Sequence, residues 1–211
     1  QNTEANIGDD ADIRLLALAA GVSDLHIEAF NDVITEQKAK LDSGGAIATA
    51  KSVVELAAAQ NATVNIGSNS TLLVDLGNIN VGAWNNAIME GRASATTYGI
   101  AGAPDGHSWA NLGVANIVNI GTDTRIEASN GYAPADGSLP RQATVNIFAG
   151  RSPESGDRFT KESVASNVNI KTTIDLFNNS AIPIPGSPDA RANVIINASV
   201  NQGTTDNTNV S

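Results

Sequence analysis

A short box of residues recurs three times along the chain, at intervals of more than fifty residues. The boxes read EANIG, TVNIG and IVNIG, and their isoleucines are Ile7, Ile66 and Ile120. After each box the next apolar residue comes at the same step, as Ile13, Leu72 and Ile126. A repeat of this length is typical of solenoids and arrays, in which one unit cannot bury its apolar side alone.

Within each unit, apolar and polar residues alternate. In the stretch from Ala62 to Trp84, Val64 and Ile66 flank Asn65, and glycine-containing turns interrupt the pattern after Ile66 and Asp75. Period-two alternation predicts strands with one buried side. We interpret residues 64–83 as one turn of a parallel β-solenoid with three short strands. Each unit then holds about two turns, and the chain holds about six to seven coils with loop insertions at the turns.

The strands match between units, whereas their connections vary in length, as expected of surface loops on a fixed scaffold. The chain is divided into units at 1–59, 60–113 and 114–189, with the start of a fourth at 190–200. Residues 201–211 are a polar tail or the start of the next coil. The stretch Ala46–Asn61 is rich in helix formers, and a short helix there is the alternative. We expect the chain to be a piece of a longer protein.

The composition suits a narrow and regular core. The 211 residues are 41% hydrophobic but only 4% aromatic, with one methionine. Stacked aliphatic side chains fill such a core without the large rings that irregular gaps require. The asparagines of the boxes, such as Asn6, Asn65, Asn119, Asn146 and Asn169, are expected to face water. The predicted core ladder consists of Ile7, Ile66, Ile120, Ile13, Leu72, Ile126, Ile27, Val81 and Ile147.

The charge of the chain excludes several classes of partner. With 22 acidic and 12 basic residues, the net charge is −10, which opposes binding to nucleic-acid phosphates and to anionic lipid. No apolar run is long enough for a membrane-spanning helix, and membrane insertion is not expected. The absence of cysteine excludes disulfides and thiolate sites.

The repeat resembles that of filamentous haemagglutinin-type bacterial adhesins, and most closely the giant adhesins with leukotoxin-type filamentous repeats. The stretch VNIGSNSTLLVDLGNINVGA follows the family pattern nearly position for position, and ANIGDDADIRLLALAAGVSDLHIEA follows it with an insertion. The resemblance covers nearly the whole chain up to Val200. It implies a right-handed parallel β-helix, secretion, and display at the bacterial cell surface as a rod.

Three aspartates that follow the first box are the only candidate metal ligands. Asp9, Asp10 and Asp12 supply the oxygen atoms that Ca²⁺ prefers. The equivalent residues of the later units lose most of these charges, and no calcium-binding loop pattern is present. A solvated turn is the favoured interpretation, and no cofactor is expected.

The best binding candidates lie in glycine- and proline-rich stretches expected to be loops. His107 and Trp109 belong to the stretch PDGHSW, where an exposed indole would stack on a sugar, or simply cover the end of a strand stack. Tyr132 belongs to the long connection 130–141, which is expected to protrude, as is the stretch 151–162. Phe30 and Trp84 share one repeat position, which favours packing over a cleft.

The sequence therefore predicts a structural and adhesive rod rather than an enzyme. The expected partners are neighbouring repeats, head-to-tail copies of the chain, and glycans or proteins of a host or bacterial surface. A carbohydrate-binding or polysaccharide-lyase-like β-helix is the alternative, but the lyase would need a groove lined by clustered acids and cations. An ice-binding solenoid is excluded, because no repeat position carries a ladder of threonines.

Overall fold

The chain folds into parallel strands that stack in successive layers. The structure is a computed structural model that describes residues 1–16, 24–129, 143–152, 164–165, 167–203 and 209–210. No helix is found among these residues, and none of them provides a helix able to span a membrane. The strands are β1 (Asn2–Ile7), β2 (Asp12–Leu15), β3 (Leu25–Ile66), β4 (Thr71–Asp75), β5 (Ile79–Ile120), β6 (Arg125–Ser129), β7 (Val145–Ala149), β8 (Arg151–Ser152), β9 (Val164–Ala165), β10 (Asn167–Pro183), β11 (Ser187–Gln202) and β12 (Asn209–Val210).

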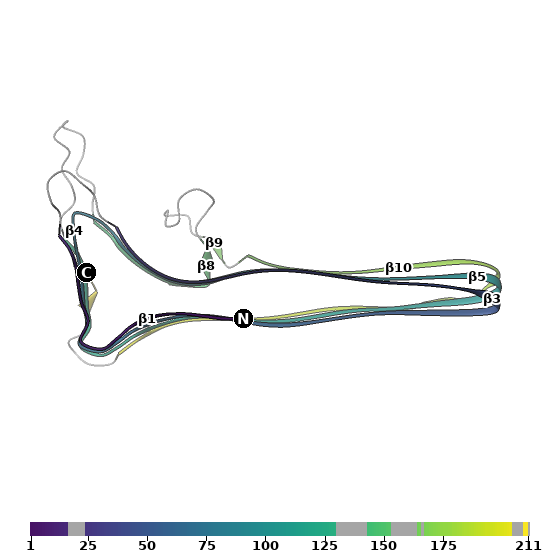
Figure 1. Ribbon diagram of the computed structural model, residues 1–211, viewed down its shortest axis with the longest axis horizontal. Coiled ribbons are helices and arrows are strands. Elements are labelled where there is room, and N and C mark those ends of the chain that lie inside the picture. Colours follow the sequence, from purple (N-terminus) through teal and green to yellow (C-terminus); the bar gives the residue numbers. More distant parts are fainter. Residues whose placement is uncertain (17–23, 130–142, 153–163, 166, 204–208, 211) are drawn as a thin grey trace, which may run out of the picture.

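Two parallel sheets contain most of these strands. The larger sheet has the order β1-β3-β5-β10, with β7 and β11 also paired to β5, and the smaller has the order β12-β6-β4-β2. Strands β8 and β9 form a separate antiparallel pair. Seen down the short axis, the layers superimpose on one long and narrow outline (Figure 1). This all-β arrangement of curled parallel sheets is compatible with a β-solenoid.

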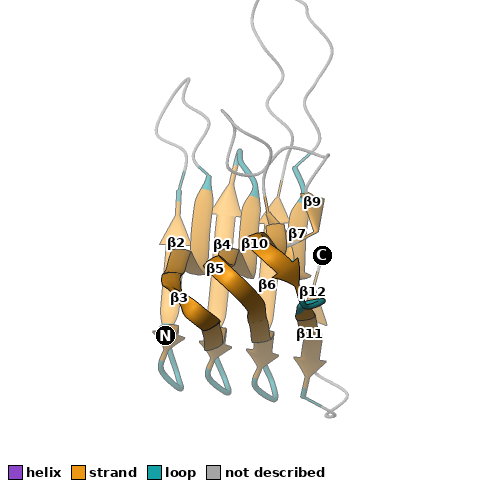
Figure 2. Cartoon of the chain, turned by 90° about the vertical axis from the view of Figure 1, so that its right-hand side faces the viewer, coloured by secondary structure: helices purple, strands orange, loops and turns teal. Residues whose placement is uncertain are grey.

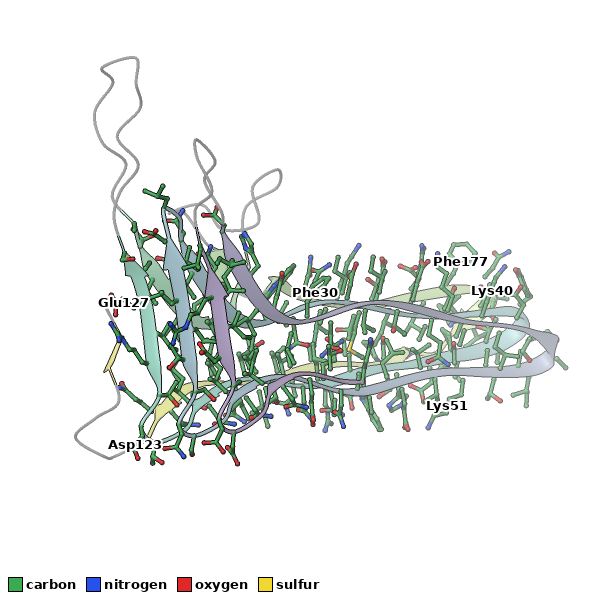
Figure 3. All side chains as sticks on the ribbon, turned by 60° about the vertical axis from the view of Figure 1, so that its left-hand side comes forward. Phe30, Lys40, Lys51, Asp123, Glu127 and Phe177 are labelled. Carbon is green, nitrogen blue, oxygen red and sulfur yellow. The ribbon has the colours of Figure 1, made fainter. Side chains whose placement is uncertain are left out.

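Each long strand bends back on itself and forms two limbs. We call the part of each layer that leads to the bend the outgoing limb (Leu25–Gly44 in β3) and the part after it the return limb (Ala46–Ile66). The strands β2, β4, β6 and β12 close the opposite end as a short wall (Figure 1). Side chains project in rows on both sides of the limbs (Figure 3).

Glycine permits the bend between the limbs. Gly45 and Gly99 are aligned in neighbouring layers and have φ values of 155° and 129°. A Cβ at Gly99 would lie 1.7 Å from the carbonyl oxygen of Gly45. In β3 and β5, inward residues are odd-numbered before the bend and even-numbered after it, as with Ala93 and Ala110. The bend therefore shifts the alternation by one residue and keeps apolar side chains inside on both limbs.

The register shows that one sequence unit makes one layer. Ile7 pairs directly with Ile66, and Ile66 pairs directly with Ile120. The expectation of two turns per unit is therefore wrong, and the described strands do not contain the six to seven coils expected from it. The stretch from Val64 to Ala83 forms one corner, the wall and the start of a limb. The alternation then continues past Trp84 without a closing turn, so the chain runs far out before it returns.

The expected short helix is also absent. Residues 46–61 form the return limb of β3, where Ala48, Ala50, Val54 and Leu56 are buried in alternation with exposed residues. Pairing with β5 along the whole limb overrides the intrinsic helix propensity of these alanines. At the end of the chain, Asn201 and Gln202 complete β11, and Asn209 and Val210 form β12, which pairs with β6.

An apolar core fills the wall end of the stack. All nine residues of the predicted ladder lie in or against one cluster. Ile27, Ile66, Leu72, Val81, Ile120 and Ile126 are buried, and Ile7, Ile13 and Ile147 are partly buried against them. A second, alanine-rich cluster around Met89 and Leu112 lies between the limbs.

Asparagine ladders connect the layers on the outside and within the core. Asn65 donates from Nδ2 to Oδ1 of Asn6 at 2.7 Å, and Asn119 donates to Asn65 at 2.7 Å. The next rung is Asn201, which donates to Asn119 at 2.8 Å. Asn169 is exposed, as expected, but it pairs with Ile88 on the outgoing limb and lies outside this ladder.

The inner ladder is buried. Asn31 donates from Nδ2 to Oδ1 of Asn85 at 2.7 Å, and Asn85 donates to Oδ1 of Asn116 at 2.8 Å. Asn31 and Asn85 also donate to the carbonyl oxygens of Asn61 and Ala115 on the return limb. These bonds join the two limbs across the core and compensate the burial of the amides.

Substitution of a core isoleucine tests the layered register. Ile66 is 2% exposed and has a paired layer on each side. We expect Ile66→Asp to lower the free energy of unfolding by several kcal/mol, because the carboxylate would be buried without a partner. The control is Ile34→Asp at a side chain that is 70% exposed, for which the expected change is below about 0.5 kcal/mol. Equal losses in denaturant titrations would contradict the register.

Substitution of a buried glutamine is expected to stabilise the fold, in contrast to Ile66→Asp. Gln60 is 1% exposed, and neither Nε2 nor Oε1 of its amide has a hydrogen-bond partner. The aligned residue in β5 is Val114. We expect Gln60→Val to raise the free energy of unfolding by about 1–3 kcal/mol, because it removes an unsatisfied buried amide. Gln37→Val, at an exposed position, should leave stability nearly unchanged. A destabilised Gln60→Val variant would show that the amide is hydrogen-bonded in solution.

Candidate functional site

Ionisable residues and one indole gather on the outer side of the return limb. His107 and Trp109 lie within β5, not on a loop as the sequence suggested, because the alternation runs unbroken through the PDGHSW stretch. The neighbouring layers contribute Lys51 from β3, and Asp189 and Arg191 from β11. With Asp105, these six residues form what we call the return-limb patch.

Aspartates organise the patch. His107 Nε2 lies 3.2 Å from Oδ2 of Asp105, and its Nδ1 lies 3.9 Å from Oδ2 of Asp189. Lys51 Nζ lies 3.8 Å from Asp105 Oδ2, and a guanidinium nitrogen of Arg191 lies 2.8 Å from Asp189 Oδ2. Both cations are therefore paired with a carboxylate. The imidazole lies between two carboxylates contributed by two different layers.

The Arg191 guanidinium lowers the pKa of Asp189. Its hydrogen bonds favour the ionised carboxylate and outweigh the opposing effect of partial burial. Asp189 in turn raises the pKa of Arg191 above its ordinary value. This pair therefore stays ionised to a lower pH than an unpaired aspartate would allow.

Trp109 is enclosed by its neighbours. Arg191 lies over the indole ring, with Cζ 5.5 Å from the centroid, and the His107 ring meets it edge-on at 5.4 Å. The cation therefore occupies a ring face that a sugar would use for stacking. The patch thus provides paired charges and a covered indole.

The aromatic rings at the repeat position shared by Phe30 and Trp84 pack between layers. The rings of Phe30 and Trp84 stack with centroids 3.7 Å apart, and Trp84 Nε1 donates to Oε1 of Glu28 at 2.6 Å. The Phe148 ring lies over Gly82, where a Cβ would come within 2.2 Å of it. This geometry agrees with the packing role expected for the shared position.

The three aspartates that follow the first box belong to a corner turn and its flank. Asp10, Asn69 and Asp123 are equivalent and all have φ = 57°, which asparagine and aspartate tolerate better than most residues. Asp9 accepts a hydrogen bond from the backbone N–H of Ser68, and Asp12 pairs with Arg14. No group of three or more histidine, aspartate or glutamate side chains that could hold a metal ion is found among the described residues.

The remaining candidates fall outside the site. The other histidine of the chain, His26, is exposed on the outgoing limb, away from His107. Tyr132 and the connection 130–141 lie outside the described residues, as does most of 151–162. Sequence reasoning missed Lys51, Asp105, Asp189 and Arg191. The signal that could have found them is the alignment of successive layers. In that alignment Val53, His107 and Asp189 share one position. Glu55, Trp109 and Arg191 share another.

Comparison of the chain with protein-family models, curated proteins and solved structures finds no match.

A pKa measurement tests the organisation of the patch. We expect Asp189 to titrate below its ordinary value of 3.8, and Arg191→Met to return its pKa toward that value. Since the folded-state pKa is lowered, the pair contributes stability above the unfolded-state pKa and loses it as pH falls through the folded-state pKa. Carboxyl-carbon NMR measures both values. Arg14→Met, at the distant pair with Asp12, is the control. An unchanged Asp189 pKa in Arg191→Met would contradict this geometry.

Proposed function

We propose that this chain is a structural and adhesive rod segment of a large secreted bacterial surface protein. The observation that carries the proposal is the residue-for-residue parallel pairing of successive sequence units. A chain built in this way extends by one layer for each added unit, which suits a spacer that holds a binding region away from a surface. The right-handed β-helix of filamentous haemagglutinin-type adhesins, and their display outside the cell, belong to this proposal.

The chemistry of the described residues supports a non-enzymatic role. In the return-limb patch both cations are paired with aspartates, and Arg191 lies over the indole of Trp109. The outer asparagine ladder and the Phe30–Trp84 stack are likewise engaged between layers. Contacts with a surface glycan or protein would then be weak and repeated along the rod.

Duplication of one unit tests the structural role. We expect copies of residues 67–120, inserted in tandem after Ile120, to lengthen the stack by about 4.8 Å each, because the insertion joins equivalent positions. Four copies would add roughly 19 Å by this spacing, which electron microscopy and small-angle scattering measure. A scrambled insert of the same composition is the control. Growth of a separate body beside the stack, rather than a longer stack, would contradict the proposal.

The adhesive part of the proposal is tested separately from the structural part. Beads coated with the chain should adhere to glycoprotein-coated surfaces more than beads coated with a scrambled-sequence chain. No difference in adherence would remove the adhesive part of the proposal and leave the spacer role standing. Binding of a glycan that Trp109→Ala abolishes, with Trp84→Ala as the matched control, would favour the carbohydrate-binding alternative.

A further inference from the structure

The chain is uncharged around the bend in each of three layers. Residues 43–50 of β3, 93–104 of β5 and 176–188 of the β10–β11 layer include no charged side chain, although charged residues flank each stretch on both sides. The bends lie at the end of the limbs far from the wall (Figure 1), and Figure 2 looks onto this end and shows them side by side. The whole chain has a net charge of −10. A second, equally acidic molecule can therefore approach the bends without meeting like charges there.

Large apolar side chains are exposed at these bends. Ile47 in β3 is 81% exposed, Ile100 in β5 is 60% exposed and Ile182 in β10 is 59% exposed. The bend of β5 lies between those of β3 and β10, so the exposure of Ile100 does not depend on which layer is the outermost. Layers add beside a bend and not over its outer side. An exposed apolar strip of this kind marks an interaction surface, and here it lengthens with every layer.

Bulky and small side chains alternate along this strip. At two adjacent positions each layer has one isoleucine and one alanine, and the isoleucine changes position from layer to layer. The three layers read Ala46–Ile47, Ile100–Ala101 and Ala181–Ile182, with Ile47, Ala101 and Ile182 aligned by backbone pairing. We call these six residues the bend stripe.

The alternation determines how two bend stripes fit when they face each other. A two-fold axis along the stacking direction exchanges the two positions within each layer, so every isoleucine faces an alanine of the other copy. An antiparallel arrangement exchanges the outer layers instead, and it places Ile100 against Ile100 and Ile47 against Ile182. Parallel stacks therefore interlock bulky and small side chains, whereas antiparallel stacks oppose isoleucine to isoleucine.

We infer that the bend stripe binds the bend stripe of a second copy of this chain, with the two stacks parallel and side by side. The stripe of one chain is much smaller than the about 20–30 residues a side of a stable interface, so the affinity depends on how many layers are in register. Parallel contact suits rods that leave one surface in the same direction. The inference deepens the proposed structural role and rests on it for the growth of the contact with rod length.

Lengthened stacks test the inference. Each copy of residues 67–120 inserted after Ile120 brings one further Ile100–Ala101 pair to the stripe. We expect four copies to tighten dimerisation about a hundredfold or more, as measured by sedimentation equilibrium. Lengthened stacks that remain monomeric at every concentration would overturn the inference. If the copies form a separate body, the proposed stacking fails, and dimerisation of the unmodified chain at rising concentration decides the inference by itself.

Exchange of isoleucine and alanine tests the fit. Ala101→Ile would face Ile100 of the other copy, and we expect it to weaken dimerisation about tenfold. The double variant Ile100→Ala with Ala101→Ile exchanges the two positions and should restore dimerisation. Ile47 and Ile182 hold the register position of Ala101, so neighbouring layers already accommodate isoleucine there. Tighter dimerisation of Ala101→Ile would contradict the interlocking arrangement.

A charge placed on the stripe tests its location. Ile100→Glu should weaken dimerisation more than tenfold, because the carboxylate would be buried against an apolar surface. The matched control is Ile34→Glu, at an isoleucine that is 70% exposed on the outgoing limb. Circular dichroism checks that both variants fold. Equal effects of the two substitutions on dimerisation would overturn the inference.

Cross-linking tests the orientation. The chain has no cysteine, so an introduced thiol is the only one present. In parallel stacks the same layers meet, and chains with Ala46→Cys should form disulfide dimers with one another. In antiparallel stacks they would instead cross-link to chains with Ala181→Cys. A mixture of the two variants that gives mainly mixed dimers would exclude the parallel arrangement.

Vesicles test a different occupant of the bend stripe. The chain is mixed with phosphatidylcholine vesicles and separated by flotation, and we expect it to stay unbound. A monomeric chain that binds these vesicles, and loses this binding in Ile100→Glu but not in Ile34→Glu, would assign the stripe to a lipid surface. That result would overturn the inference of a second copy.

Discussion

Parallel backbone pairing between equivalent residues of successive units is the constraint on which the rest of the structure depends. From Leu25 to Ile66, β3 keeps one offset to β5, interrupted only at the bend beside Gly45. A one-residue slip would turn every inward side chain outward. The buried apolar positions on both limbs and in the wall therefore fix the register together.

Once the register is set, like residues meet between layers. Asparagines form hydrogen-bonded ladders, Phe30 stacks on Trp84, and the charges of the return-limb patch pair across three layers. They also explain how a chain with few aromatic residues orders a long and thin core, because mostly small and aliphatic side chains occupy the inward positions of successive layers.

Much of the alignment between units was predictable from the chain alone. The boxes ending at Gly8, Gly67 and Gly121, and the apolar residues that follow them, occupy aligned positions in the structure. The patch was not predictable in full. Its two aspartates, Asp105 and Asp189, lie far apart in the sequence, and only the pairing of β11 with β5 brings them to one imidazole.

The sequence determined the strand character, the buried positions and the equivalence of the units, because alternation and repeat spacing are local properties of the chain. The tertiary structure decided how far the chain runs before it returns. Two chain paths satisfy the local alternation near Val64 equally well. In one the layer is complete at Ala83, and in the other the chain runs out along one limb and returns along the second to Val118. Only the pairing of whole limbs, the parity shift at the Gly45 and Gly99 bend, and the amide ladder from Asn31 to Asn116 select the longer path.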